Sequence, residues 1–145
     1  MYDHELTLTI TNSIIDEYAT YYFRLHPKAK KKPITVPYHP SINTWVIMRR
    51  PLMNALKQKW KSFMVWFVEY LGYTNMNILE CEIICTTYFK TKIRHDCDNQ
   101  TPKFILDGMV DAGLIIDDDE KHITSLTLRC GYDKDNPREE ILIKY

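Results

Sequence analysis

Residues 78–116 read ILECEIICTTYFKTKIRHDCDNQTPKFILDGMVDAGLII and contain the strand-to-helix passage that decides the fold. The segment from Ile78 to Tyr88 is rich in residues that favour β-structure, which predicts a central strand. Residues 91–95 are expected either to continue that strand or to open a second one. Pro102 suits the first turn of a helix and Gly113 its end, so we expect a helix between them.

Two further elements are expected upstream. Leu6, Leu8 and Ile10 alternate with polar residues, which predicts a half-buried first strand. Ser13 is expected to cap a short helix through Tyr22, with Asp16 and Glu17 in its first turn. A long helix is predicted from about Pro51 to Gly72, because apolar residues recur there at spacings of three and four. The residues of that stripe are Leu52, Leu56, Trp60, Met64, Phe67 and Leu71.

At the C-terminus, the segments His122–Cys130 and Glu140–Tyr145 are expected to form a β-hairpin, with Gly131–Pro137 as its turn. Strands and helices are mixed along the chain without a repeat. We therefore predict a single α/β (α+β) domain with a mixed β-sheet packed against two main helices. Residues 1–33 are expected to be an N-terminal extension with the first strand, and residues 34–145 the main domain.

The composition agrees with one globular domain: the chain has 145 residues, of which 45% are hydrophobic and 26% charged. No apolar run approaches the ~18 residues that span a bilayer. The polar start, Met1–Glu5, does not have the features of a secretory signal. Four irregularly spaced cysteines do not suggest a disulfide framework, so we expect a cytoplasmic protein.

The formal net charge of zero conceals an asymmetry between the two halves of the chain. Residues 18–68 contain ten Lys or Arg and no Asp or Glu, whereas residues 73–145 contain fourteen acids and nine bases. A long acid-free basic segment is typical of a surface that binds a polyanion. The alternative is two solvated faces of opposite charge.

An acidic constellation begins at Asp96-Cys97-Asp98-Asn99, where the strand should end. In an extended segment, residues two apart point to the same face, so Asp96 and Asp98 are expected to direct both carboxylates to one point. A divalent cation relieves the repulsion between them, and Mg²⁺ prefers such oxygen ligands. The acidic run 117–120 is the expected source of a further ligand. The alternatives are helix caps for Asp98 and Asn99 and a polar turn for the run.

Zinc is the competing metal, because cysteine and histidine side chains are available. No CxxC or HxxxH spacing occurs, although structural zinc sites usually contain such pairs. We therefore expect core or near-surface thiols and ordinary polar histidines, with contact to phosphate or to a metal-bound water as the alternative for the histidines. The residues concerned are Cys81, Cys85, Cys97, Cys130, His95 and His122.

The acidic residues belong to a longer pattern: Arg94–Asn99, Lys103, Asp107, Ala112-Gly113 and Asp117-Asp118. This pattern resembles the RusA family of Holliday-junction resolvases, which has an Asp-x-Asp-Asn motif, a lysine soon after it and an Ala-Gly-x-x-x-Asp-Asp segment. Upstream, the segment Val36–Asn43 is similar to the family's Pro-x-x-Pro-Ser-x-Asn segment. The resemblance covers residues 34–143.

The resemblance implies a homodimeric endodeoxyribonuclease that resolves four-way DNA junctions by paired nicks. It depends on Mg²⁺, with Mn²⁺ as the alternative ion, and needs neither an organic cofactor nor a membrane. By position, Asp96 and Asp98 match the essential pair of carboxylates, and Asp118 matches the third. Asp117 stands beside it as a further metal ligand, and Lys103 matches the family lysine. Residues 34–145 would then be the nuclease domain, and a phage or prophage origin is expected.

Two departures leave the register of the motif open. Pro102 lies inside a segment that is one residue longer than in the family: counting back from Asp107 selects Lys103, whereas counting forward from Asp98 selects Pro102. The run of aspartates also includes Asp119, although counting from the preceding glycine selects the first two.

Binding to DNA is expected to use basic residues of the acid-free segment together with one arginine beside the motif. They are Lys30, Lys31, Lys32, Arg49, Arg50, Lys57, Lys61 and Arg94. Two alternative functions are a metal-dependent nuclease acting on forks, flaps or RNA, and a non-catalytic DNA-binding module. The homodimer is expected to form through the aromatic face around Trp60, Trp66 and Tyr70 or through the strand at 78–88. The alternative for Trp66 is packing under the N-terminal extension.

Overall fold

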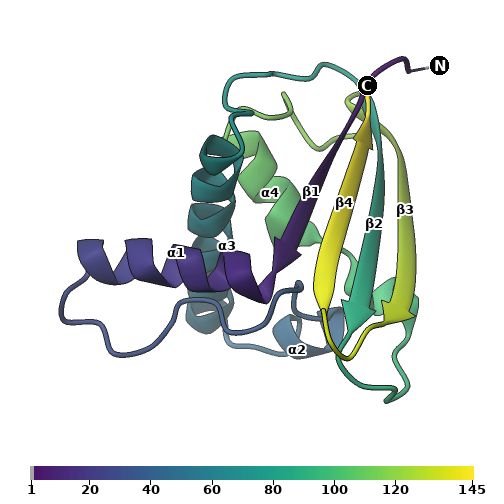
Figure 1. Cartoon of the computed structure of the whole chain (residues 1–145). Coiled ribbons are helices and arrows are strands. Elements are labelled where there is room, and N and C mark those ends of the chain that lie inside the picture. The colour runs from purple at the N-terminus through teal and green to yellow at the C-terminus, as the bar shows by residue number, and fades with distance from the viewer. Residues whose placement is uncertain (1) are drawn as a thin grey trace.

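Alternating apolar residues at the N-terminus form the edge strand β1 (Glu5–Thr11) in the computed structural model, which describes residues 2–145, so that Met1 lies outside it. The sheet also contains β2 (Cys81–Phe89), β3 (Ile123–Tyr132) and β4 (Arg138–Lys144). The spatial order is β1-β4-β2-β3, with β2 parallel to β3 and antiparallel to β4 (Figure 1). The predicted mixed sheet of an α+β domain is confirmed.

The predicted terminal hairpin is wrong, because β2 lies between β3 and β4. The link between the two strands passes the end of β2, where the Asp133 N–H donates to the Phe89 carbonyl at 2.9 Å. Burial explains the order. Ile141 and Ile143 of β4 are completely buried, as suits a strand inside the sheet, whereas β3 is largely exposed, as suits an edge.

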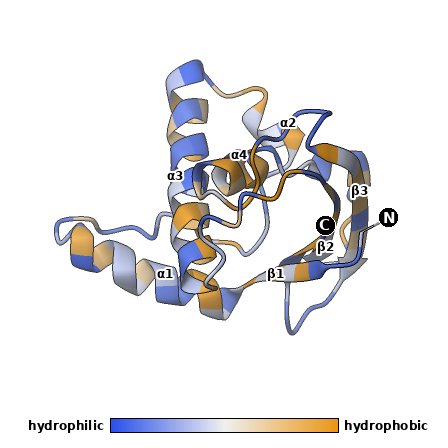
Figure 2. Cartoon of the chain, turned by 90° about the horizontal axis from the view of Figure 1, so that it is seen from above, coloured by the Kyte–Doolittle hydropathy of each residue, from blue (hydrophilic) through white to orange (hydrophobic). Residues whose placement is uncertain are grey.

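Two helices cover one face of the sheet, as predicted. They are α3 (Arg50–Tyr70) and α4 (Lys103–Asp111), and α4 is the more hydrophobic helix, lying between α3 and the sheet (Figure 2). The predicted stripe of α3 is shifted at its start, because Leu52 is 62% exposed. Its core residues are Trp60, Phe63, Met64, Phe67 and Val68.

The helices approach closely at Gly108 of α4. A Cβ built on Gly108 would lie 2.5 Å from Met64 Cβ, which is closer than atoms can pack. Glycine therefore allows α4 to lie directly on α3.

Helix α1 (Asn12–Leu25) is longer than predicted and begins earlier. Its cap is Thr11, whose hydroxyl accepts from the Ile14 N–H at 3.2 Å, and not Ser13. The first turn consequently contains no acidic residue. The helix packs on α3, where Tyr18 meets the Phe63 ring edge-on, with centroids 5.2 Å apart.

Two short elements flank the predicted site. They are α2 (Ile42–Trp45) and the 3₁₀ helix η1 (Cys97–Gln100), and residues 91–95 form no strand. No helix within residues 2–145 has both the length and the apolar character to cross a membrane.

Much of the expected dimer surface is used within the chain. Trp60 is only 3% exposed, and both edges of β2 are paired. Trp66 packs against Tyr18 of α1, with ring centroids 5.2 Å apart, which is the alternative that the sequence offered for it. Of the three aromatic residues, Tyr70 is the most exposed, at 51%.

Candidate functional site

Helix α4 and the loop after it bring two carboxylates together. Asp107 lies in the middle of α4, and its side chain is 16% exposed. Asp118 lies in the loop that leads to β3. Burial, followed by the contact with the Asp107 carboxyl group, raises the pKa of Asp118. Like charges in contact favour a proton or a cation between them.

Two lysines flank this pair. Lys57 of α3 places Nζ 3.7 Å from Asp107 Oδ2, and Lys103, one turn earlier on α4, places Nζ 4.0 Å from Asp107 Oδ1. Asp107 Oδ2 is buried and has no hydrogen-bond partner among residues 2–145. We define Lys57, Lys103, Asp107 and Asp118 as the carboxylate–lysine cluster. A buried carboxylate oxygen without a hydrogen bond, beside a second carboxylate, fits a cation ligand.

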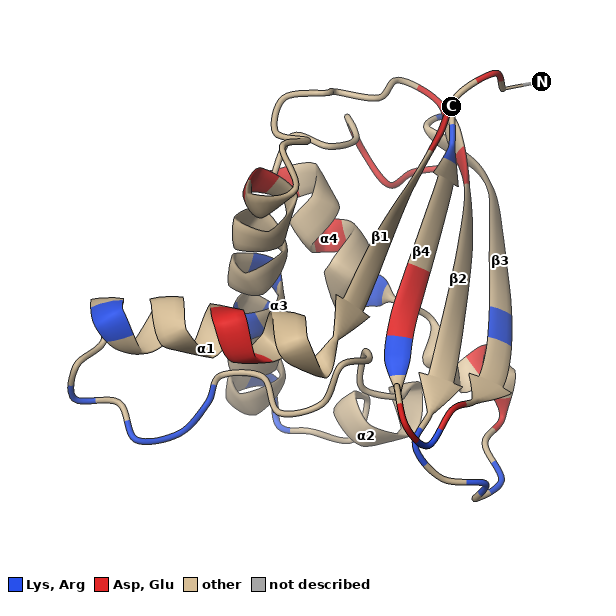
Figure 3. Ribbon diagram, in the orientation of Figure 1, with Lys and Arg blue, Asp and Glu red and all other residues tan. Residues whose placement is uncertain are grey.

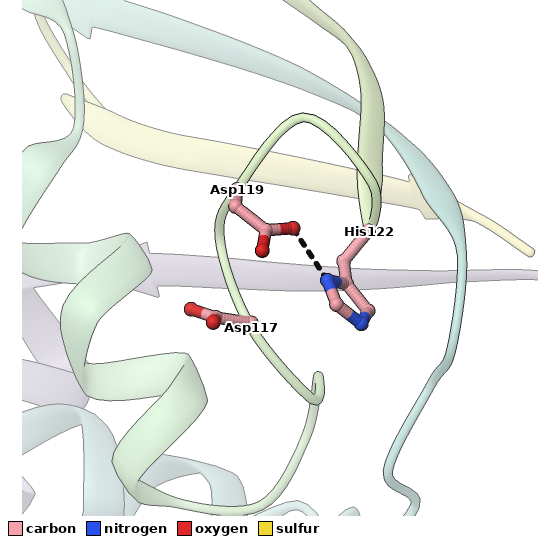
Figure 4. A group of neighbouring side chains, drawn as sticks. All are labelled: Asp117, Asp119 and His122. Atoms are coloured by element: carbon pink, nitrogen blue, oxygen red, sulfur yellow. Dashed lines mark hydrogen bonds and ion pairs between the residues drawn. The ribbon is translucent and has the colours of Figure 1, made fainter.

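A second group forms on the same loop from Asp117, Asp119 and His122, with one possible ligand atom of each within 4.8 Å of the others (Figure 4). His122 Nδ1 bonds Asp119 Oδ1, and this contact holds the pKa of Asp119 below its usual value. Asp117 Oδ1 accepts from the Asp118 N–H at 2.8 Å. The consecutive aspartates therefore have different neighbours: Asp118 contacts Asp107 of α4, whereas Asp119 bonds His122.

Asp96 and Asp98 lie apart from both groups. They flank Cys97 of η1, which contacts Cys130 near the end of β3, whereas the loop with Asp118 precedes the first residue of β3. Asp96 is the extended cap of η1 and Asp98 lies inside the 3₁₀ turn, so the expected same-face alternation does not apply. The Asp96 side chain is 61% exposed and lies 3.9 Å from Arg94.

A buried polar network was missed in the sequence. Glu139 of β4 is completely buried, and its two oxygens accept from the His39 N–H at 3.2 Å and from the Thr87 hydroxyl at 2.5 Å. Burial raises the pKa of Glu139 to about 7. The signal was available, because Glu139 is in phase with Ile141 and Ile143 of the same strand.

The predicted DNA-binding residues fall into two sets. Four of them form ion pairs: Lys32 with Asp16 at 2.8 Å, Lys61 with Asp111 at 3.0 Å, and Lys57 and Arg94 as described above. The others are exposed and have no ion pair among residues 2–145. They are Lys30, Lys31, Arg49 and Arg50. Figure 3 shows the basic loop after α1 and the basic residues along α3.

The cysteines do not form a three-ligand group in the described part of the chain. Cys81 and Cys85 are buried strand residues, as expected for core thiols. Burial raises the pKa of Cys81 to about 11, so its thiol stays protonated at neutral pH. His122, expected to be an ordinary polar neighbour, bonds Asp119 and lies close to Asp117.

No protein-family model matches the chain, and no curated protein matches it significantly. The resemblance to the RusA family therefore stays a prediction from the motif residues.

Proposed function

We propose that this chain is a Mg²⁺-dependent endodeoxyribonuclease that nicks branched DNA, with the four-way junction as its substrate. The observation that carries the proposal is the carboxylate–lysine cluster. Lys103 and Asp118, chosen from motif spacing, meet there around Asp107, a third residue of the same motif.

The cluster fits a cation, because the buried Asp107 Oδ2 has no hydrogen-bond partner and Asp118 lies against the same carboxyl group. Asp107 and Asp118 would hold the ion. Bound Mg²⁺ supplies an acidified water and stabilises negative charge on the phosphoryl oxygens. Mn²⁺ takes the same oxygen ligands.

The two lysines act on the DNA phosphate. Lys103 and Lys57 place ammonium groups within 4.0 Å of Asp107, so a phosphate at the cluster would meet two cations. They orient the scissile phosphate and reduce the cost of the charge that develops during attack. The exposed basic residues of the loop after α1 and the start of α3 hold the flanking strands.

Two copies of the chain belong to the proposal. Symmetric resolution of a four-way junction needs two cuts, and one chain offers one carboxylate–lysine cluster. A two-fold homodimer matches the symmetry of the junction. Sedimentation at micromolar concentration tests this part, and a stable monomer that cuts both strands in concert contradicts it.

The nuclease proposal is tested with labelled four-way, fork, flap, linear and RNA substrates, each with Mg²⁺ or with chelator. We expect nicks in the four-way junction that require Mg²⁺. Asp118→Asn should abolish them, whereas Asp119→Asn, the adjacent matched control, should retain most of the activity. Preferred cutting of forks, flaps or RNA would reassign the substrate. If the chain binds DNA but does not cut it with any metal ion supplied, the alternative of a non-catalytic DNA-binding module is favoured.

A further inference from the structure

A cavity of about 510 Å³ lies between α1 and α3, on a part of the chain that the motif pattern does not explain. Its volume is in the range of small-ligand sites. Tyr21 and Tyr22 line it from α1 and Trp66 from α3, and Tyr18 also contributes to its lining.

The aromatic rings leave surface open to a ligand. Tyr21 is 39% exposed, and its centroid lies 6.2 Å from that of Trp66, with the planes tilted by 32°. Tyr22 stacks on His26 at 4.3 Å. Tyr18, at 4% exposure, belongs to the core, and the partly buried Trp66 packs against it. Such rings can take a flat π-system by stacking.

The rim of the cavity has an excess of unpaired positive charge. Both His26 and Pro33 line the cavity, so the loop between them begins and ends beside it. Figure 3 shows that this loop is basic. Lys59 also lines it, is exposed and has no ion pair among residues 2–145. The loop adds three more lysines that are exposed and have no ion pair among residues 2–145: Lys28, Lys30 and Lys31.

Acidic groups only partly offset these cations. Glu69 and Asp111 line the cavity, and Asp111 already pairs with Lys61 at 3.0 Å. Asp16 of α1 pairs with Lys32 at 2.8 Å. Glu17 bonds Tyr70. Of the acids that line the cavity, Glu69 thus has no ion pair among residues 2–145, against Lys59 in the lining and three free lysines in the adjoining loop.

We propose that the cavity between α1 and α3 binds an unpaired base of single-stranded DNA, with the bordering lysines on its phosphates. Aromatic stacking beside a basic track is the combination that single-stranded DNA requires. An apolar peptide would leave the lysines uncompensated, and a small anion would not use the rings. The inference rests on the proposed function, which supplies branched DNA as the substrate. It adds that the cavity recognises an unpaired base of that substrate.

The test measures the affinity of the whole chain for a fluorescent single-stranded oligonucleotide by anisotropy, without divalent metal. Tyr21→Leu removes a stacking ring, and Tyr132→Leu, at 43% exposure on β3, is the matched control. We expect Tyr21→Leu to bind at least about fivefold more weakly. The control should bind as the unchanged chain does. Lys59→Gln should reduce the slope of log K against log salt by about 0.7.

Equal affinities for the Tyr21→Leu and Tyr132→Leu chains would overturn the inference. A second measurement needs no substitution: an oligonucleotide with 5-iododeoxyuridine is photo-crosslinked to the unchanged chain. Crosslinks at Tyr21, Tyr22 or Trp66 support the site, and crosslinks confined to other aromatic residues contradict it.

The inference and the proposed function fail separately. If the chain binds the oligonucleotide through Tyr21 but cuts no branched DNA, the binding site is supported and the nuclease proposal fails. If the chain cuts four-way junctions with Mg²⁺ but binds single strands independently of Tyr21, the nuclease proposal is supported and the binding site fails.

Discussion

Nε2 of His39 accepts a hydrogen bond from the backbone N–H of Phe104 at 3.0 Å, across 65 residues of sequence. Phe104 stands in the first turn of α4, and the cap residue Pro102 offers no side-chain bond to that turn. The other ring nitrogen, Nδ1, donates to the Pro40 carbonyl at 2.7 Å, which assigns the neutral tautomer. Burial agrees, because it lowers the pKa of His39 to about 4. His39 therefore caps the helix that carries Lys103 and Asp107.

Replacing this cap should destabilise the fold. His39→Ala leaves the Phe104 N–H without a partner and opens a cavity, so we expect a loss of about 3 kcal/mol in the free energy of unfolding. Urea denaturation measures it. His4→Ala, at an exposed histidine, is the control and should change stability little. Equal midpoints for the two variants would show that His39 does not support α4.

Glu139 predicts a pH dependence of stability. Its folded pKa is raised to about 7 from an ordinary value of 4.5, so its contribution is fully present below pH 4.5 and is lost as the pH rises to 7. In Glu139→Gln, the amide oxygen can accept from the His39 N–H while the amide group donates to the Thr87 hydroxyl. The variant should therefore gain in melting temperature relative to the unchanged chain as the pH rises from 4.5 to 7.

The buried His39 gives a pH dependence of stability with the opposite sign. The folded pKa of His39 is lowered from 6.5 to about 4, so its contribution is present above pH 6.5 and is lost as the pH falls towards 4. Between pH 4.5 and 6.5 the two groups partly offset each other in the unchanged chain. A Glu139→Gln difference that stays constant with pH would contradict the assignment to Glu139.

Close contact between two helices makes a separate prediction. Gly108→Ala would place a Cβ against Met64, so α4 must move away from α3. We expect a loss of about 2 kcal/mol, measured by thermal unfolding. Asn54→Ala, at an exposed position of α3, is the control. An unchanged melting temperature in Gly108→Ala would mean that the helices separate at little cost.

Much of the fold could be predicted because hydrophobic periodicity reports it directly. The alternation around Leu8 and the three-and-four spacing around Trp60 each identified the right element. Strand order could not be predicted in this way. Neighbouring strands in the sequence usually pair, and no local pattern shows that β2 lies between β3 and β4.

The site was predictable only in part for a similar reason. The match to the family motif selected Lys103, which is the first residue of α4, and Asp118, which lies in the loop after this helix. The contact of Lys57 with Asp107 depends on how closely α3 and α4 approach, which Gly108 sets and a linear motif does not describe. The two-residue spacing of Asp96 and Asp98 also assumed an extended backbone, and it could not predict that Asp98 lies in a 3₁₀ turn.

The basic residues should differ in what they contribute to DNA binding. Lys30 and Lys31 are exposed, whereas Lys57 and Lys61 are ion-paired with acids of α4. Lys30→Gln with Lys31→Gln should flatten the slope of log K against log salt by about 0.9 for each DNA phosphate that the chain no longer neutralises. Lys57→Gln with Lys61→Gln should change this slope less and lower the melting temperature more. Equal slopes for both double variants would contradict this division.

The motif resemblance implies that Asp96 and Asp98 are metal ligands, whereas the structure places them away from Asp118. If these residues are metal ligands, Asp96→Asn and Asp98→Asn keep the side-chain shape but remove the charge that the metal needs. We then expect each to slow nicking of a four-way junction by about 100-fold or more while junction binding is largely retained. Asp135→Asn, at an exposed turn, is the control. Because both residues lie apart from Asp118 in this structure, such a loss would require residues 90–101 to move towards the carboxylate–lysine cluster on DNA. Wild-type nicking by both variants, together with inactive Asp118→Asn, would restrict the site to Asp107, Asp118 and the two lysines.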